Sequence, residues 1–261
     1  MDTRRPPVWW ELAVGLVTYV ACTSLSRVSF GDKHAAALAN ARELLLLESR
    51  LGLDVEESTN RWLAAQGWLA TVTAYHYAVM YAITSIAVLV FLYLRHPQTY
   101  RWGRRSVLLL NVLAAICFAL FPVAPPRLQP NLAIVDIVTR QHIWGTWGSP
   151  VGDGVNQLAA LPSLHFALVI WVLVMLMIST RSVVLITLAA VDVVLTALIV
   201  VATGNHYPLD LVAGAALVAI SVPVTRPAPP SRPRRRPHGW LGRLTDGLRA
   251  RAILLADPDP R

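Results

Sequence analysis

The sequence is poor in charged residues and in cysteine. Only 15% of its 261 residues are Asp, Glu, Lys or Arg, whereas soluble domains carry about 25%. This composition excludes a soluble globular domain as the default class, and the 55% share of hydrophobic residues favours an integral membrane protein. The two cysteines, Cys22 and Cys117, both fall in apolar stretches, which argues against a disulfide framework and against a thiolate metal site.

Long apolar runs indicate how often the chain crosses the bilayer. A helix needs about 20 mostly apolar residues to span the hydrocarbon core. No small-residue cleavage pattern follows the first run, so we expect it to stay as a signal anchor in a mature chain that starts near Met1. We expect an all-α integral membrane protein, a bundle of six transmembrane helices, at about residues 8–30, 69–94, 106–123, 163–179, 182–202 and 208–225.

The basic residues predict which side of the membrane each loop faces. The net charge is +8, and cytoplasmic loops carry an excess of Lys and Arg. With six spans and a cytoplasmic N-terminus, 16 of the 23 basic residues lie on the cytoplasmic side, nine of them between Arg226 and Arg261. We therefore expect a plasma-membrane protein with both termini in the cytoplasm, and no nucleic-acid partner.

Two segments outside the expected spans have a composition of their own. The sequence RPAPPSRPRRRPH begins at residue 226 and lacks apolar periodicity, which predicts a basic cytoplasmic tail over 226–261 beside a membrane domain over 1–225. Leucines around Trp240 favour a short amphipathic helix in that tail. In the first outer loop, LLLL at 44–47 is flanked by charges, which favours interfacial helices over a seventh span.

Three short motifs lie at the outer ends of expected spans: APPR at 124–127, LPSLH at 161–165 and GNHYPLD at 204–210. Proline suits the first position of a helix, where the missing N–H costs nothing, so Pro162 and Pro208 predict helix starts. Unpaired N–H groups and the positive end of the dipole favour an anion at such starts. With an arginine and two histidines close by, the motifs predict a phosphate-binding pocket that faces outward.

The residue types in these motifs suit phosphoryl transfer through a histidine. Neutral imidazole attacks phosphorus through one nitrogen while a carboxylate on the other fixes the tautomer, which fits His206 with Asp210. His165 is the candidate that protonates the leaving alkoxide and later accepts a proton from the incoming alcohol or water. Arg127 supplies a cation for the phosphate oxygens, Ser163 is a further phosphate-binding candidate, and no metal or cofactor is needed.

In this order on a six-span chain, APPR, PSLH and GNHY-x-x-D resemble the motifs of the type 2 phosphatidic acid phosphatase superfamily, and of its inositol phosphorylceramide synthase-like branch in particular. The resemblance covers most of residues 35–225. It implies a six-helix membrane bundle in which His206 forms a phosphohistidine, His165 is the acid/base and Asp210 orients His206. It also implies hydrolysis of a lipid phosphate, or transfer of its phosphoryl-containing group to another alcohol.

The sequence departs from the phosphatase pattern of that superfamily. The lysine, the proline and the serine–arginine pair of the pattern are replaced here by Leu120, Leu128, Ile199 and Val200, and PSGH has become PSLH. The missing cations point away from the ordinary phosphatase branch and leave Arg127 as the one clear cation of the motifs. Arg140 and His142, in the loop that follows, are candidates to compensate.

Other polar residues have two interpretations each. His76 suits either an aromatic belt at the outer interface or a wall of the headgroup pocket. Asp192 lies mid-span, about 16 Å below the expected pocket at roughly 1.5 Å per residue, so we expect a buried polar contact with Asn111. Asn205 and Tyr207 are candidate headgroup contacts within the third motif. Loop polarity alone accounts equally for the remaining candidates, which are Asn156, Gln157, Asp136 and Asp153.

The sequence thus favours a membrane phosphotransferase that acts on a phospholipid, a polyprenyl phosphate or a sphingoid phosphate and passes the group to an alcohol such as inositol. A lipid phosphate or pyrophosphate phosphatase would use the same three residues with water as acceptor. A non-catalytic lipid-binding protein is the third alternative, and its behaviour would not depend on His206.

Overall fold

The computed structural model describes residues 5–26, 33–143 and 156–228, and in these ranges it consists of helices, loops and one isolated β-bridge. The expected tail beyond residue 228, with Trp240, lies outside the described residues, as does Asp153. The helices longer than ten residues are α1 (Val8–Ser26), α2 (Lys33–Leu51), α5 (Tyr81–Arg95), α6 (Pro97–Leu120), α8 (Leu164–Ser179), α9 (Val183–Ala202) and α10 (Pro208–Val224).

Four stretches are long and apolar enough to cross a membrane: Val8–Leu25, Gly67–Arg95, Pro97–Leu120 and Val183–Ala202. The second is one continuous helical rod made of α4 (Gly67–Tyr75), the π-helix η1 (His76–Met80) and α5. Helices α8 and α10 are also apolar but shorter. These helices indicate a membrane protein, and they begin and end close to the expected spans with one exception.

The exception is α6, which begins at Pro97, nine residues before the expected start of its span. The first turns carry Arg101, Arg104 and Arg105, whose charges hid the helix in the apolar pattern. The structure accommodates Arg104 because it pairs with Glu11 of α1, while the neighbouring Gly103 is buried. A polar first turn at a membrane boundary extends the helix beyond its apolar run.

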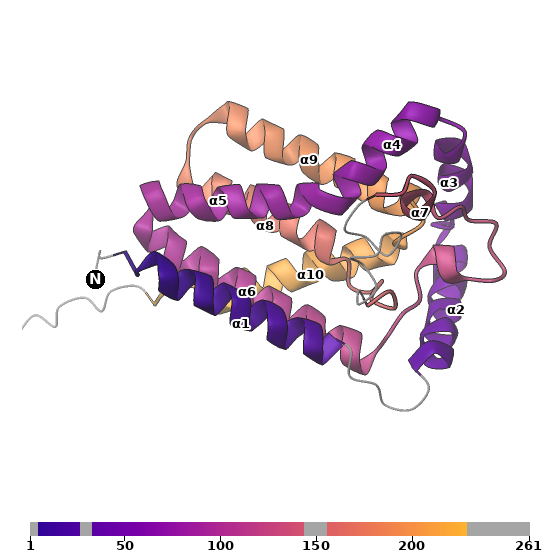
Figure 1. Cartoon of the computed structure of the whole chain (residues 1–261), viewed down its shortest axis with the longest axis horizontal. Coiled ribbons are helices and arrows are strands. Elements are labelled where there is room, and N and C mark those ends of the chain that lie inside the picture. The colour runs from indigo at the N-terminus through magenta and orange to yellow at the C-terminus, as the bar shows by residue number, and fades with distance from the viewer. Residues whose placement is uncertain (1–4, 27–32, 144–155, 229–261) are drawn as a thin grey trace, which may run out of the picture. The chain divides into compact units, whose positions relative to one another are not determined.

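The long helices run side by side, and α2 and α3 (Glu56–Ala64) lie across one end of them (Figure 1). We call this the α2/α3 end. Asn60 of α3 fastens it, because its amide donates to the carbonyl oxygens of Ala202 and Val135 at 3.0 Å each and accepts from the Val135 N–H at 2.8 Å. The segment after α6 reaches the same end, where the Ala124 N–H donates to the Ala37 oxygen at 3.1 Å.

The core of the bundle lies between α5, α6, α8 and α10. Trp171 of α8 is fully buried, and its indole N–H donates to the Ser106 hydroxyl of α6 at 2.8 Å. Met175 and Leu110 pack in the same cluster with no exposed surface. Because close-packed interiors resist displacement, this cluster fixes α8 against α6 and so sets where the first turn of α8 stands.

Candidate active site

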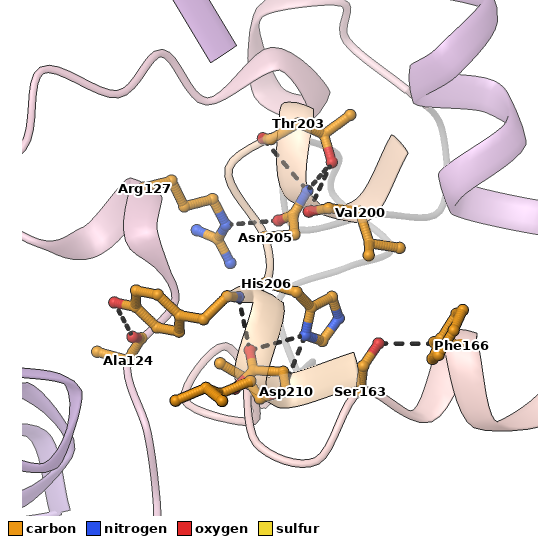
Figure 2. A network of polar contacts seen from close by, with 12 residues as sticks. Ala124, Arg127, Ser163, Phe166, Val200, Thr203, Asn205, His206 and Asp210 are labelled. Atoms are coloured by element: carbon orange, nitrogen blue, oxygen red, sulfur yellow. Dashed lines mark hydrogen bonds and ion pairs between the residues drawn. The ribbon is translucent and has the colours of Figure 1, made fainter. Parts of the chain in front are cut away.

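The start of α10 is organised around the Asp210 carboxylate. Pro208 occupies the first helical position, as the sequence predicted, and Tyr207 is the N-cap residue. Asp210 is fully buried, and its Oδ2 accepts from the Tyr207 backbone N–H at 2.8 Å and contacts His206 Nδ1 at 3.3 Å. One carboxylate oxygen therefore caps the helix and holds the histidine that precedes it (Figure 2).

The contacts of His206 fix which of its ring nitrogens carries the proton. Nδ1 lies 2.9 Å from the carbonyl oxygen of Ala160 as well as 3.3 Å from the Asp210 carboxylate. A carbonyl oxygen can only accept, so Nδ1 must be the donor and carries the hydrogen. The neutral ring then keeps a free lone pair on Nε2. His206 is 3% exposed and lines a cavity, so this lone pair is sheltered from bulk water.

His165, in the first turn of α8, sits between two tyrosine rings. Its imidazole stacks on Tyr77 with 4.4 Å between ring centroids and meets the edge of Tyr81 at 4.2 Å. The centroid of His206 is 5.8 Å away. Tyr77 lies in η1 and Tyr81 is the residue that follows it. π-Helical turns occur frequently at functional sites, and here the turn presents two rings to one histidine.

Arg127 enters the site from η2 (Pro126–Leu128), and three polar groups orient it. Its Nε donates to Asn205 Oδ1 at 2.9 Å, while Nη1 contacts Gln157 Oε1 at 3.2 Å and Asp136 Oδ2 at 3.5 Å. Its backbone N–H donates to the Gly204 oxygen at 2.9 Å, which ties η2 to the turn before α10. The side chain is only 3% exposed, and this burial lowers the pKa of Arg127 while Asp136 opposes the shift.

These side chains surround one cavity of about 240 Å³. A water molecule occupies about 30 Å³ in the liquid, so the space suits a phosphate group with a few waters. Arg127, His165 and His206 all line it, together with Asn156, Gln157 and Asn205. The structure thus brings the three sequence motifs to one cavity, at the α2/α3 end of the bundle.

Ser163 is the N-cap of α8, so the helix begins at Leu164, two residues after the predicted proline start. Its hydroxyl accepts from the Phe166 N–H at 3.4 Å, and the residue is fully buried. The predicted contact of Ser163 with a phosphate therefore does not match its position, because the hydroxyl is used for the helix cap and does not line the cavity. Leu164, at the position where the phosphatase pattern has glycine, does line it.

A family model for the PAP2 superfamily matches residues 42–224, which is most of the chain. The matched range contains α3 to α10 and every residue of the cavity. The chain belongs to the PAP2 superfamily. Neither the curated proteins nor the solved structures compared with it gave a match. Membership indicates an enzyme of the phosphatase or phosphotransferase type that acts on phosphorylated lipids.

For a PAP2 member, the cavity has few cations. Among the described residues that line it, Arg127 is the only Lys or Arg. Arg140 and His142, the candidates to compensate, do not line the cavity: the Arg140 guanidinium donates to the Ala64 oxygen at 3.3 Å, and His142 is exposed on a left-handed turn with φ of 50°. The groups around Arg127 are instead the amides of Asn205 and Gln157 and the carboxylate of Asp136.

Two of the predicted headgroup contacts point elsewhere in this PAP2 chain. Tyr207 is fully buried, and its hydroxyl donates to the Ala124 oxygen at 3.0 Å, away from the cavity. His76 Nε2 pairs with Asp192 Oδ1 at 3.0 Å on the side of η1 that faces α9. This pair corrects the expected Asp192–Asn111 contact, since the Asn111 amide donates to the Val107 oxygen of its own helix.

Asn205 and Asn156 have the predicted position at the cavity wall. Asn205 also connects Arg127 to the end of α9. Its amide nitrogen donates to the Thr203 hydroxyl at 2.9 Å, and its oxygen accepts from Arg127. Asp136 caps α7 (Ile137–Arg140) by accepting from the Thr139 N–H at 2.9 Å, and its other oxygen faces Arg127. Asn205 and Asp136 therefore hold the Arg127 guanidinium in place, and Asn205 and Asn156 form part of the cavity wall.

Two buried glutamates support the PAP2 site from outside the motifs. Glu48 of α2 accepts from the Leu209 N–H at 2.8 Å, so it caps the start of α10 across the fold. Glu48 and Glu56 of α3 are 0% and 3% exposed. Burial and the neighbouring carboxyl raise the pKa of Glu48 to about 9, and burial raises that of Glu56. In the sequence, Glu48 had counted only as one of the charges that flank LLLL and favour an interfacial helix.

Proposed function

We propose that this protein is a membrane phosphotransferase that takes a phosphorylated lipid through a phosphohistidine and passes the group to an alcohol such as inositol, as in the inositol phosphorylceramide synthase-like branch. The observation that carries the proposal is the pair of contacts of His206 Nδ1 with Ala160 and Asp210, which leaves Nε2 as the nitrogen for attack in a residue that lines the cavity with Arg127 and His165. A fixed, deprotonated nitrogen in a buried phosphate-sized space is what nucleophilic attack on phosphorus requires.

In the first step, His206 Nε2 attacks phosphorus and the bond from phosphorus to the leaving oxygen breaks. His165 donates a proton to that oxygen, so the leaving group departs as a neutral alcohol. Asp210 stabilises the positive charge that develops on the His206 ring. Arg127, which Asn205 holds in place, faces the non-bridging oxygens, where charge is concentrated in phosphoryl transfer.

In the second step, the acceptor hydroxyl gives its proton to His165 while its oxygen attacks the phosphohistidine. The N–P bond breaks and His206 returns to its neutral form. Water in place of the alcohol gives the phosphatase, which remains the second candidate because the cavity has room for either small acceptor.

We further propose that α8 and α10 also cross the membrane, which gives six spans, with α2 and α3 as interfacial helices. Both termini would then be cytoplasmic, and the basic tail from Arg226 would lie at the anionic inner leaflet. The cavity would open at the outer face of the plasma membrane, where a polyol or water can reach it. The membrane domain would comprise residues 1–225.

The test is turnover of a panel of phosphorus-labelled phospholipids by the purified protein in lipid, with a chelator present, with and without inositol. Label in a new phosphodiester that depends on inositol supports the transferase. Free phosphate regardless of inositol identifies a phosphatase. The His206→Ala variant is the control, and turnover that does not depend on His206 would leave a non-catalytic lipid-binding protein as the better explanation.

A further inference from the structure

A second, larger cavity of about 580 Å³ opens along the bundle between α1, α5 and α6. Tyr81, Phe118 and Leu164 line both this groove and the catalytic cavity, so the two spaces adjoin at these residues. We call the larger space the α1 groove. The catalytic cavity suits a phosphate but is too small for a long hydrocarbon chain. A lipid whose phosphate lies beside His206 must therefore place its chain elsewhere, and the α1 groove adjoins that position.

The walls of the α1 groove are mainly hydrocarbon, with α1 as its outer wall. The span Val8–Leu25 has none of its residues buried, although α1 is tied to α6 at the other end through Glu11. Gly15 of α1 lines the groove, and a Cβ added there would meet no atom within 4 Å. The small residue keeps the passage between α1 and α5 wide.

Ser85 of α5 lines the groove and is 6% exposed, and its hydroxyl has no hydrogen-bond partner among the described residues. Serine and threonine in membrane helices usually donate to a carbonyl of the preceding turn, as the neighbouring Thr84 does to the Met80 oxygen at 2.9 Å. A buried hydroxyl without a hydrogen-bond partner is unfavourable, so Ser85 is suited to a ligand group.

Ser85 lies one helical turn from Tyr81, which contacts His165. Four residues at 1.5 Å each correspond to about 6 Å along α5. In a glycerolipid or a sphingoid phosphate, an ester, amide or hydroxyl group lies a few bonds from the phosphorus. A polyprenyl phosphate has only hydrocarbon there. The position of Ser85 therefore discriminates between these classes of lipid.

We propose that the α1 groove binds the hydrocarbon chain of the substrate, and that Ser85 donates a hydrogen bond to an ester, amide or hydroxyl oxygen near its phosphate. The inference rests on the proposed function of the cavity beside His206. It names the donor as a glycerolipid or a sphingoid phosphate and not a polyprenyl phosphate.

Photo-crosslinking tests the groove without any need for turnover. The probe is phosphatidic acid with a diazirine in the middle of one acyl chain, added to the inactive His206→Ala protein in lipid nanodiscs. We expect labelled peptides from α1 and α5, and at least a fivefold loss of that label when Gly15→Trp fills the groove. Leu16→Trp, on the adjacent exposed position of α1, should leave the label unchanged. Equal labelling in both tryptophan variants would overturn the proposal.

The lipid class is tested by turnover in the otherwise native chain. We expect Ser85→Ala to lower kcat/KM for long-chain phosphatidic acid and for sphingosine 1-phosphate about three- to tenfold, and to leave undecaprenyl phosphate within twofold of the native value. An equal loss for all three lipids would contradict the role of Ser85. Absence of His206-dependent turnover for every lipid would instead refute the proposed function, while the crosslinking result would still stand.

Discussion

At the scale of single residues, the two histidines and the aspartate were predictable from the sequence because their arrangement is local. His206 and Asp210 are four residues apart across a helix start, and that spacing alone brings the carboxylate to the ring at 3.3 Å. Tyr77 and Glu48 were not predictable as parts of the site. Each meets its partner from a distant part of the chain, so tertiary packing decides the contact.

Asp210→Asn isolates the electrostatic part of this arrangement. The amide oxygen can still accept from the Tyr207 N–H, so α10 should keep its cap, whereas the negative charge beside His206 is lost. We expect kcat to fall by about 10²–10⁴, the usual contribution of a group that acts through acid–base chemistry, with KM little changed. Single-turnover kinetics with labelled lipid measure this effect, and a variant with more than half of the native kcat would contradict the role given to Asp210.

The raised pKa of the buried Glu48 carboxyl predicts a dependence of stability on pH. The pKa of Glu48 in the folded protein is about 9, above its usual 4.5, so the folded state keeps a proton that the unfolded chain releases. The stabilisation is complete below about pH 4.5 and is lost as pH rises towards 9. Asp54, Asp210 and Tyr207 are the other titratable groups that act on this pair.

In the Glu48→Gln variant the side chain is neutral at every pH, and its amide oxygen can still accept from the Leu209 N–H. We expect its thermal midpoint in detergent to match that of the native protein near pH 5 and to exceed it increasingly up to pH 9. Glu48→Ala removes the cap of α10 as well and should be less stable at every pH. Parallel curves for the native protein and the glutamine variant would show that Glu48 is not protonated.

At the scale of elements, helix boundaries followed the apolar runs wherever charge and burial change together. The predicted start was wrong for α6, whose charged first turns are compensated by Glu11. It was also wrong for α8, where Ser163 and not Pro162 determines the start. The π-turn at His76–Met80 has no signature in the sequence. Its geometry depends on contacts made from both sides, with Asp192 on one and His165 on the other.

The crossing of α8 and α10 depends on a glycine. A Cβ at Gly214 would lie 2.6 Å from the Ser163 carbonyl oxygen, which is backbone and cannot rotate away. Gly214→Ala should therefore push the start of α8 from α10, destabilise the protein by about 1–3 kcal/mol as overpacking does, and lower kcat at least tenfold by moving His165 from His206. Gly67→Ala, in the first turn of α4 with no atom within 4 Å of its new Cβ, is the matched control and should behave as native.

At the scale of the whole molecule, the number of spans and their direction are predictions from charge and hydropathy. Four helices have the length and composition to cross a membrane, and α8 and α10 are shorter. If both of these also cross, the α2/α3 end with its cavity faces outward, because the arginine-rich turns lie at the opposite end. A cavity on the outer side draws its acceptor from outside the cell, so orientation bears directly on which alcohols or water can complete the reaction.

Cysteine accessibility decides this orientation. In a background with Cys22→Ala and Cys117→Ala, Ser58→Cys places an exposed thiol on α3, and Gln98→Cys places one in the first turn of α6. We expect a membrane-impermeant maleimide to label Ser58→Cys in intact cells and Gln98→Cys only after lysis. Because α3 is bonded through Asn60 to the end of α9, a label on α3 also locates the cavity. The reverse pattern would put the active site on the cytoplasmic side and exclude an external acceptor for the phosphohistidine.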